Sequence, residues 1–248
     1  MVLRKTPAQI AHMRRAGRVV AEMHEACIRA SVPGATTADL DRAARDVLDK
    51  RGARSNFLGY HGFPAVVCTS PNEVIVHGIP GPRRLEAGDI VSIDCGAIIE
   101  GWHADAAVTV AVEETDEESR RLMDVTRRAL EASIGAMKVD ARLGDLGAAS
   151  EEVVRAAGFS VVREYVGHGI GTAMHEDPEV PNYGRRGRGL RLRDGIVLAI
   201  EPMVNAGSHE VEIKEDGWTA VTKDGSLAAH FEHSVAITRN GPYILSQL

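Results

Sequence analysis

The 248-residue chain has few cysteines and no long apolar run. Cys27, Cys68 and Cys95 are isolated, odd in number and without metal-type spacing, which predicts free thiols in a reducing environment rather than disulfides. No apolar stretch approaches the roughly 18 residues needed to span a bilayer, and the N-terminal segment has no hydrophobic signal core. These absences predict a cytoplasmic protein without a membrane partner.

An excess of positive charge is also absent. The net charge is −6, with acidic and basic residues interspersed. The sequence therefore predicts no basic face and no direct binding of nucleic acid. No linker or low-complexity stretch marks a domain boundary, and 44% hydrophobic residues supply an ample core. We therefore expect a single domain over 1–248.

Helix caps mark two helices in the first part of the chain. Thr6 as the cap and Pro7 at the first helical position predict a helix that ends at the segment SVPG. Thr36, with Asp39 three residues later, predicts a second helix that stops at Gly52.

The same layout of a long helix, a short link, a shorter helix and a glycine recurs in 116–158. Adding 106 to each residue number aligns nine identical residues between 26–52 and 132–158. Both stretches are rich in alanine, so two unrelated amphipathic helix pairs are the alternative explanation. The repeat favours two similar halves, roughly 1–115 and 116–248, within one domain.

Several segments with β-branched residues and a shorter period predict strands. They are 65–70, 89–96, 103–112, 159–166, 195–202, 210–222 and 230–238. Helices grouped apart from such strands predict the α+β class, with a mixed and largely antiparallel sheet.

Segment 92–110, SIDCGAIIEGWHADAAVTV, predicts a hairpin with an aspartate inside each strand. If the turn is centred on Ile99 and Glu100, Asp94 and Asp105 face each other on one side of the sheet. Like charges directly across a strand pair are destabilising, and an unpaired buried carboxylate costs several kcal/mol. Either a positive group lies between them, or one aspartate ends a strand and the other is solvated.

More acids and imidazoles lie on segments typical of a core. Glu201 ends the apolar run GIVLAIE, and Glu232 lies on one face of an alternating strand. His168 lies between two glycines, in the segment GHG, which allows close approach of the backbone. His77 and His175, taken singly, are more typical of hydrogen-bonded loop residues than of catalytic groups.

Taken together, these segments supply four carboxylates and one imidazole: Asp94, Asp105, His168, Glu201 and Glu232. Hard oxygen donors with one imidazole suit divalent Mn, Fe, Co or Zn, and four carboxylate charges balance two divalent ions. A hydrolytic site with two metals would supply the positive charge that the hairpin needs.

The succession of motifs along the chain resembles methionine aminopeptidases of type I. The motifs are NEVIVHGIP, SIDCG, HAD, GHGIG, MHEDPEVPNY, IEPM and DGWTAVTKDGSLAAHFEHS, in a match that runs from about residue 6 to residue 238. Type II enzymes carry a helical insertion between the histidine and the first glutamate ligand, whereas only 25 residues separate His175 from Glu201 here. The resemblance implies the pita-bread fold, with two pseudo-symmetric halves around a central, mostly antiparallel sheet.

The resemblance also implies a role for each metal ligand. Asp105 and Glu232 would bridge two divalent ions, which in this family are Co, Mn, Fe, Zn or Ni. Asp94 would chelate one ion, and His168 with Glu201 would hold the other. The same five residues follow from the donor set alone.

Catalytic and substrate contacts are implied for His77 and His175, with Glu201 as the proton carrier. The pocket for the methionine side chain would be lined by Tyr60, Phe63, Cys68, Met174 and Trp218. Two positions depart from the pattern, because Gly96 stands where relatives often have a hydroxyl residue and Met174 where an aromatic residue is common.

The resulting hypothesis is a metal-dependent hydrolase that removes the initiator methionine from nascent polypeptides when the second residue is small. It would act as a cytoplasmic monomer near the ribosome exit. One alternative is a proline-directed aminopeptidase of the aminopeptidase P or prolidase kind, which shares the fold and a similar ligand set. Another is an inactive peptide-binding protein on the same scaffold, although such relatives lose ligands and this chain keeps them.

Overall fold

Residues 2–248 are described by a computed structural model of the chain, which contains two pairs of α-helices. The helices are α1 (Pro7–Ala30), α2 (Thr37–Arg51), α3 (Glu117–Ala136) and α4 (Leu143–Ala156), and a 3-10 turn, η1, covers Tyr60–Gly62.

The strands are short except for one long hairpin, β4 (Ile90–Ile99) and β5 (Trp102–Ala111). The others are β1 (Arg54–Ser55), β2 (Val67–Pro71), β3 (Val74–Val76), β6 (Ser160–Val161), β7 (Gly167–Gly169), β8 (Glu176–Val180), β9 (Val197–Ile200), β10 (Met203–Asn205), β11 (Val211–Ile213), β12 (Ala220–Thr222), β13 (Ala228–His230), β14 (His233–Thr238) and β15 (Gly241–Ile244).

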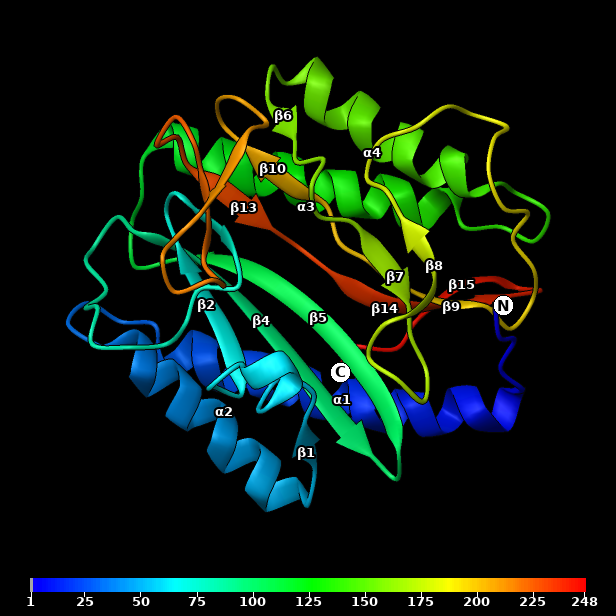
Figure 1. Ribbon diagram of the computed structural model, residues 1–248, viewed down its shortest axis with the longest axis horizontal. Coiled ribbons are helices and arrows are strands. Elements are labelled where there is room, and N and C mark those ends of the chain that lie inside the picture. The colour runs from blue at the N-terminus through cyan, green and yellow to red at the C-terminus, as the bar shows by residue number, and fades with distance from the viewer. Residues whose placement is uncertain (1) are drawn as a thin grey trace.

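The helix pairs enclose the strands from two sides (Figure 1). Helices α1 and α2 pack together, with α1 against β4 and β5, whereas α3 and α4 pack together beside β13 and β10. One sheet has the order β1-β4-β2 with β5 added to β4, and another has the order β15-β14-β9-β7-β8. Each pairing in these two sheets is antiparallel, so the predicted α+β class with mostly antiparallel strands is confirmed.

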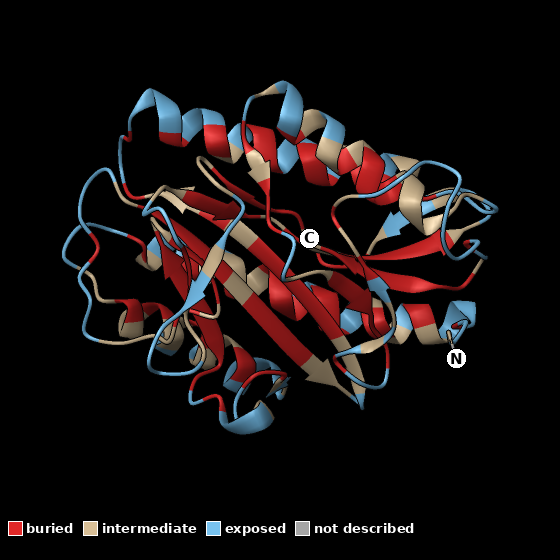
Figure 2. Cartoon of the chain, turned by 45° about the horizontal axis from the view of Figure 1, so that its top comes forward, coloured by how far each residue is buried: buried red, intermediate tan, exposed pale blue. Residues whose placement is uncertain are grey.

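The helix boundaries follow the predicted caps. The hydroxyl of Thr6 accepts a hydrogen bond from the backbone N–H of the third helical residue, and Pro7 opens α1. Thr36 and Asp39 form the reciprocal capping box of α2, which ends at Gly52 with a φ of 61°. Each helix buries one face, and the strands β2, β9 and β10 between the helix pairs are buried along their whole length (Figure 2). Between residues 2 and 248 no helix is long and apolar enough to cross a membrane.

The offset of 106 holds for the local structure of the helix pairs. Helices α2 and α4 begin at Thr37 and Leu143, which are 106 residues apart, and the third residue of each helix is an aspartate. Asp39 accepts a hydrogen bond from the N–H of Thr36 at 2.7 Å, and Asp145 accepts one from the N–H of Arg142 at 2.7 Å. The two helix pairs therefore share the aspartate contact of the cap at matching positions, whereas the hydroxyl that Thr36 adds has no counterpart at Arg142.

The register of the long hairpin differs from the prediction. Asp105 lies opposite Gly96, and Asp94 lies opposite Ala107, so the prediction that the two aspartates face each other is wrong. The turn is centred one residue later, on Glu100 and Gly101, whose φ values are 51° and 81°. Positive φ at both central positions is the pattern of a type I′ hairpin turn, which a β-branched Ile99 would resist. The aspartates still share one face, as diagonal neighbours.

Two predicted strands are shorter than expected. In 159–166 only β6 forms, and 210–222 divides into β11 and β12 around a turn. Glu232 lies just before β14 rather than inside it, although its side chain is buried. Each departure occurs where the chain turns to reach the cavity described below, so pairing ends there despite favourable strand propensity.

Candidate metal centre

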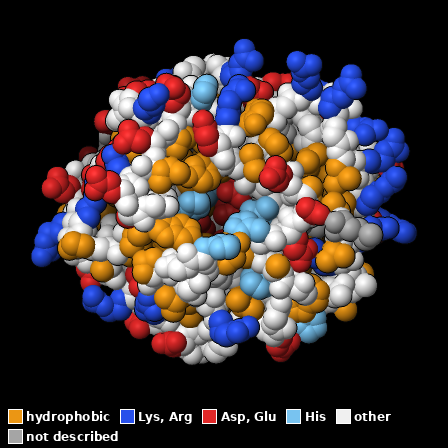
Figure 3. Space-filling view, in the orientation of Figure 1, with side chains coloured by type: hydrophobic (Ala, Val, Ile, Leu, Met, Phe, Trp, Pro, Cys, Tyr) orange, Lys and Arg blue, Asp and Glu red, His pale blue; other side chains and the backbone are white. Residues whose placement is uncertain are grey.

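A cavity of about 170 Å³ opens on the face of the molecule shown in Figure 3, where acidic and histidine side chains lie at the bottom of a hollow rimmed by hydrophobic ones. Every residue predicted from the sequence as a metal ligand, catalytic group or pocket wall lines this cavity. They are Tyr60, Phe63, Cys68, His77, Asp94, Asp105, His168, Met174, His175, Glu201, Trp218 and Glu232. Both halves of the chain therefore contribute to one site.

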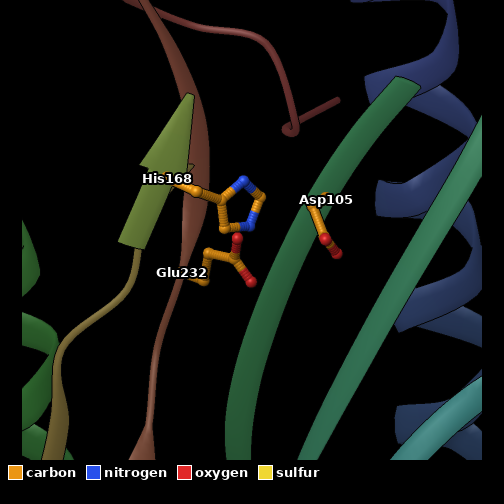
Figure 4. Close-up of side chains that lie close together, drawn as sticks. All are labelled: Asp105, His168 and Glu232. Carbon is orange, nitrogen blue, oxygen red and sulfur yellow. The ribbon is translucent and has the colours of Figure 1, made fainter. Parts of the chain in front are cut away.

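Three of the predicted ligands form a compact group. Asp105 comes from β5, His168 from β7 and Glu232 from the segment before β14 (Figure 4). One donor atom from each of the three lies within 4.8 Å of the others, and their exposed fractions are 4%, 8% and 2%. Asp94 and Glu201 line the same cavity outside this tight group. Two carboxylates and an imidazole at this spacing can hold a divalent cation.

Backbone contacts between the halves hold β5 and the Glu232 segment in register. The N–H of Glu232 donates to the carbonyl of Ala107 at 2.8 Å. The hydroxyl of Ser234 accepts from the N–H of Asp105 at 2.9 Å and donates to the Asp105 carbonyl at 2.8 Å. Because these bonds join residues far apart in the chain, they position two carboxylates that no local motif could bring together.

The orientation of His168 follows from its own strand. Its Nδ1 lies 2.9 Å from the carbonyl oxygen of Gly169, so Nδ1 carries the proton and donates. The other ring nitrogen, Nε2, lies 3.5 Å from a carboxylate oxygen of Glu201 and is left with a free lone pair. A backbone carbonyl thus selects the tautomer that a metal ligand needs.

Burial of the carboxylates is costly unless a cation is present. Desolvation raises the pKa of Asp94 to about 7, and desolvation with the neighbouring carboxylates raises the pKa of Asp105 and Glu201 well above the usual range. The pKa of Glu232 is raised for the same reasons, first by burial and then by Glu201 and Asp94.

The buried carboxylates also lack partners. One oxygen each of Asp94, Asp105 and Glu232 is buried without a hydrogen-bond partner among residues 2–248. Unpaired buried acids are avoided in folded proteins, whereas the same acids are stabilised when they coordinate a cation. The residues present therefore fit divalent metal ions.

Burial also keeps the remaining histidines neutral. Desolvation, with a smaller effect of His175, lowers the pKa of His77 to about 4. Desolvation also lowers the pKa of His175, whose Nδ1 lies 2.6 Å from the hydroxyl of Tyr60. The rings of His168 and His175 are in edge contact, with centroids 4.2 Å apart. Neutral imidazoles beside a cation can donate one N–H each to a bound molecule.

An apolar pocket adjoins the ligand group. Phe57, Phe63, Ala65, Cys68 and Met174 form a buried cluster against which Tyr60 and Trp218 pack. The rings of Phe63 and Trp218 meet edge to face at 5.1 Å. Asp216 accepts a hydrogen bond from the backbone N–H of Trp218 at 2.8 Å, which holds the turn between β11 and β12 that presents this indole.

Sequence reasoning missed several residues of the cavity, namely Phe57, Val76, Tyr165, Val166, Met203 and His230. His230 is 2% exposed, and its Nε2 lies 3.7 Å from a carboxylate oxygen of Glu201. The alternation that placed Glu232 on the site face also places His230 on that face, so this residue could have been found. The others come from loops and short strands without a periodic signal.

The two departures from the family pattern have different structural settings. A Cβ atom at Gly96 would lie 2.7 Å from the side chain of Asn56, so only glycine fits while Asn56 is there. The amide of Asn56 donates to the carbonyl of Ala104 at 3.0 Å, next to Asp105. Met174 packs within the apolar cluster and is 5% exposed.

Comparison with known proteins agrees with this geometry. The chain matches the model of metallopeptidase family M24 over residues 11–239. It is 51% identical to a methionine aminopeptidase of Clostridium acetobutylicum, over 99% of both chains. A crystal structure of methionine aminopeptidase from Thermotoga maritima superimposes with a TM-score of 0.98 at 47% identity, covering 100% of each chain.

A more distant structure, the prolidase from Pyrococcus furiosus, superimposes with a TM-score of 0.80 at 21% identity. It covers 99% of this chain but only 65% of the prolidase, and it shows the shared fold alone. The pita-bread fold predicted from the motifs is thereby confirmed. With a buried acid-histidine cavity that fits divalent cations and a family match along nearly its whole length, the chain belongs to metallopeptidase family M24.

Proposed function

We propose that the chain is a type I methionine aminopeptidase, which hydrolyses the first peptide bond of a polypeptide that begins with methionine and continues with a small residue. One observation carries the proposal. The group of Asp105, His168 and Glu232 and the apolar cluster around Phe63 and Met174 share one cavity of about 170 Å³. A cavity of about 150 Å³ accommodates a molecule the size of benzene, so this one has room for a single side chain beside the reacting bond.

The chemical roles of the residues follow from their places in the cavity. Divalent ions at such a ligand group supply Lewis-acid polarisation of a carbonyl and lower the pKa of a water molecule. Glu201, buried at the ligand end with a raised pKa, takes the proton from the attacking water and passes it to the leaving amine. His77 and His175 donate hydrogen bonds to the oxygen that gains negative charge at the scissile carbonyl.

We infer two divalent ions per chain, because four carboxylate charges balance two such cations. Asp94, Asp105, His168, Glu201 and Glu232 would hold these ions, with Asp105 and Glu232 shared between the two, Asp94 on one, and His168 with Glu201 on the other. The donor set suits Co, Mn, Fe, Zn or Ni without distinguishing among them.

We further propose that residues 1–248 form one catalytic domain with halves of roughly 1–115 and 116–248. Both halves supply residues to the cavity, which supports this division. The expected substrates are N-termini of nascent polypeptides near the ribosome exit, and the enzyme is expected to act there as a cytoplasmic monomer that binds no nucleic acid directly.

Substrate selectivity tests the function directly. Tripeptides that begin Met-Ala should be cleaved with a kcat/KM orders of magnitude above those that begin Met-Lys or Met-Phe, because the second residue lies against the buried ligand group. The apolar slot gains sulfur-aromatic contacts of about 0.3–1.5 kcal/mol from a thioether. One methylene in such a pocket is worth about 1–3 kcal/mol. Peptides that begin with norleucine should therefore have a kcat/KM modestly below that of Met peptides, and peptides that begin with Ala a much lower one. The assay uses purified, metal-reconstituted protein.

The same assay separates the alternatives. Met-Ala-Ser and Met-Pro peptides are compared with Leu-Ala-Ser and Ala-Pro-Ala. Comparable rates on Leu-Ala-Ser and Met-Ala-Ser would indicate a general aminopeptidase, and a strict requirement for proline after the cleaved residue would indicate a proline-directed one. Metal-loaded protein that cleaves none of them would favour a binding protein on this fold.

Cys68 should line the pocket without acting as a nucleophile. Burial, followed by the charges of Asp94 and Asp105, raises the pKa of its thiol well above the ordinary value, so the reactive thiolate is suppressed. We expect Cys68→Ser to fold, bind metal and retain turnover. A correctly folded, metal-loaded Cys68→Ser protein with no activity would contradict this assignment.

A further inference from the structure

The hydroxyl of Tyr60 points away from the apolar pocket that its ring helps to line. Its oxygen lies 2.6 Å from Nδ1 of His175, and the two rings are tilted by 51° with centroids 5.4 Å apart. The ring packs against the cluster of Phe57 and Phe63. One side chain therefore contacts the apolar pocket with its ring and a catalytic histidine with its polar tip.

The loop that carries Tyr60 is built to hold this position. Tyr60 opens the turn η1. Gly59 just before the turn and Gly62 at its end have φ values of 83° and 90°, and His61 has a φ of 47°. A non-glycine residue in the left-handed region carries strain that the surrounding structure must offset. Hydrogen bonds of 2.9 Å close the turn, from the N–H of Tyr60 to Phe57 and from the N–H of Gly59 to Phe63.

The backbone of His175 is held separately, by the next residue. One carboxylate oxygen of Glu176 accepts from the N–H of Thr172 at 2.8 Å, and the other is 2.5 Å from the ammonium of Lys5 in a nearly buried ion pair. These contacts position the loop but make no hydrogen bond to the ring of His175, so they do not select its tautomer. The contact with Tyr60 is what can select the ring state.

The chemistry of the contact indicates which tautomer is selected. A phenol is a strong donor, and Nδ1 of His175 lies 2.6 Å from the hydroxyl of Tyr60, where it can accept that proton. When Nδ1 of a neutral imidazole accepts a hydrogen bond, the ring proton must lie on Nε2. Nε2 of His175 has no hydrogen-bond partner among residues 2–248, and the ring lines the cavity, so its N–H remains available there.

We propose that Tyr60 is a positioning residue whose hydroxyl holds His175 as the tautomer protonated on Nε2, ready to donate to the carbonyl oxygen of the scissile bond. The catalytic part of this inference rests on the proposed function, whereas the tautomer itself does not. Tyr60 thereby couples the methionine pocket to the catalytic group, because its ring and its hydroxyl move as one rigid unit.

Nitrogen chemical shifts test the tautomer without using activity. Zinc-loaded protein with ring-¹⁵N histidine is suitable because Zn²⁺ has no redox chemistry, and the His175 signals are assigned by their loss in His175→Gln. The native protein should show a protonated Nε2 and an unprotonated Nδ1, whereas Tyr60→Phe should show a mixture of tautomers. Tyr165→Phe removes another hydroxyl from the same cavity and should leave the His175 signals unchanged.

Kinetics then test the role. Tyr60→Phe keeps the ring in the pocket, so KM for Met-Ala-Ser should change little while kcat falls about 10-fold, as when the outer hydrogen-bond partner of a functional histidine is lost. Tyr243→Phe, on the exposed strand β15, should keep native kinetics. Equal thermal midpoints for Tyr60→Phe and the native protein establish that folding is not the cause.

Three results would overturn the proposal: a His175 protonated on Nδ1 in the native protein, a native kcat in Tyr60→Phe, or a rise in KM alone. If the native protein does not cleave Met-Ala-Ser at all, the proposed function fails and the catalytic role of Tyr60 fails with it. The nitrogen shifts would still establish or refute the hydrogen bond in that case.

Discussion

Removing divalent metal with a chelator should abolish hydrolysis of Met-Ala-Ser, and adding back metal should restore it. Asp94, Asp105, Glu201 and Glu232 lie together in the cavity with raised pKa values, and a cation is the group that offsets their repulsion. The only cysteine of the cavity, among residues 2–248, has its thiol pKa raised, so no nucleophile replaces the metal. The measurement is the steady-state rate with metal content determined on the same sample.

Thermal stability provides a second readout of the same prediction. A ligand that binds only the folded state stabilises it by about 2.7 kcal/mol when its free concentration is 100 times Kd. Chelation should therefore lower the midpoint of the native protein. Glu232→Gln lacks one carboxylate of the compact ligand group and should show a much smaller response to the chelator. Turnover that survives with metal verified absent would refute the metal-dependent mechanism.

Glu201→Gln should lower kcat by about 10⁴-fold or more. Proton transfer by a positioned side chain contributes about 10²–10⁴-fold, and the substitution also removes a charge from the ligand group. Glu201 lies 3.5 Å from Nε2 of His168 and 3.7 Å from Nε2 of His230, so the amide can occupy the same space. The measurement combines kcat with metal content, because loss of metal and loss of the proton carrier contribute separately.

His175→Ala is the matched comparison for Glu201→Gln. Removing a single donor to the developing oxyanion costs about 10²–10³ in kcat, and the metals should be retained because His175 is not a proposed ligand. A metal-free His175→Ala protein would make this histidine a ligand and the assigned scheme wrong. A Glu201→Gln protein with nearly native kcat would exclude Glu201 as the proton carrier.

Much of the architecture could be predicted because it depends on short-range hydrogen bonds. Thr6 with Pro7, and Thr36 with Asp39, begin their helices where the sequence predicted, because a capping side chain bonds to N–H groups within three residues. Such bonds do not depend on the rest of the fold. The same locality explains why an offset of 106 relates the helix pairs.

The hairpin shows the limit of local reasoning. Alternation correctly placed Asp94 and Asp105 on one face, since side chains alternate along any strand. The register was wrong because it depends on the turn, and Glu100 and Gly101 both adopt positive φ there. The glycine at the second turn position was the available signal.

The sequence by itself determined the family, the helices and the chemical character of the ligand set, because motif order, caps and donor types are properties of neighbouring residues. Only the tertiary structure decided how these groups meet. The hydroxyl of Ser234 holds the backbone of Asp105, Asn56 fills the space beside Gly96, and Tyr60 bonds to His175 across 115 positions of the chain. Such contacts join segments that are distant in sequence, and their geometry exists only once the two halves have packed around the cavity.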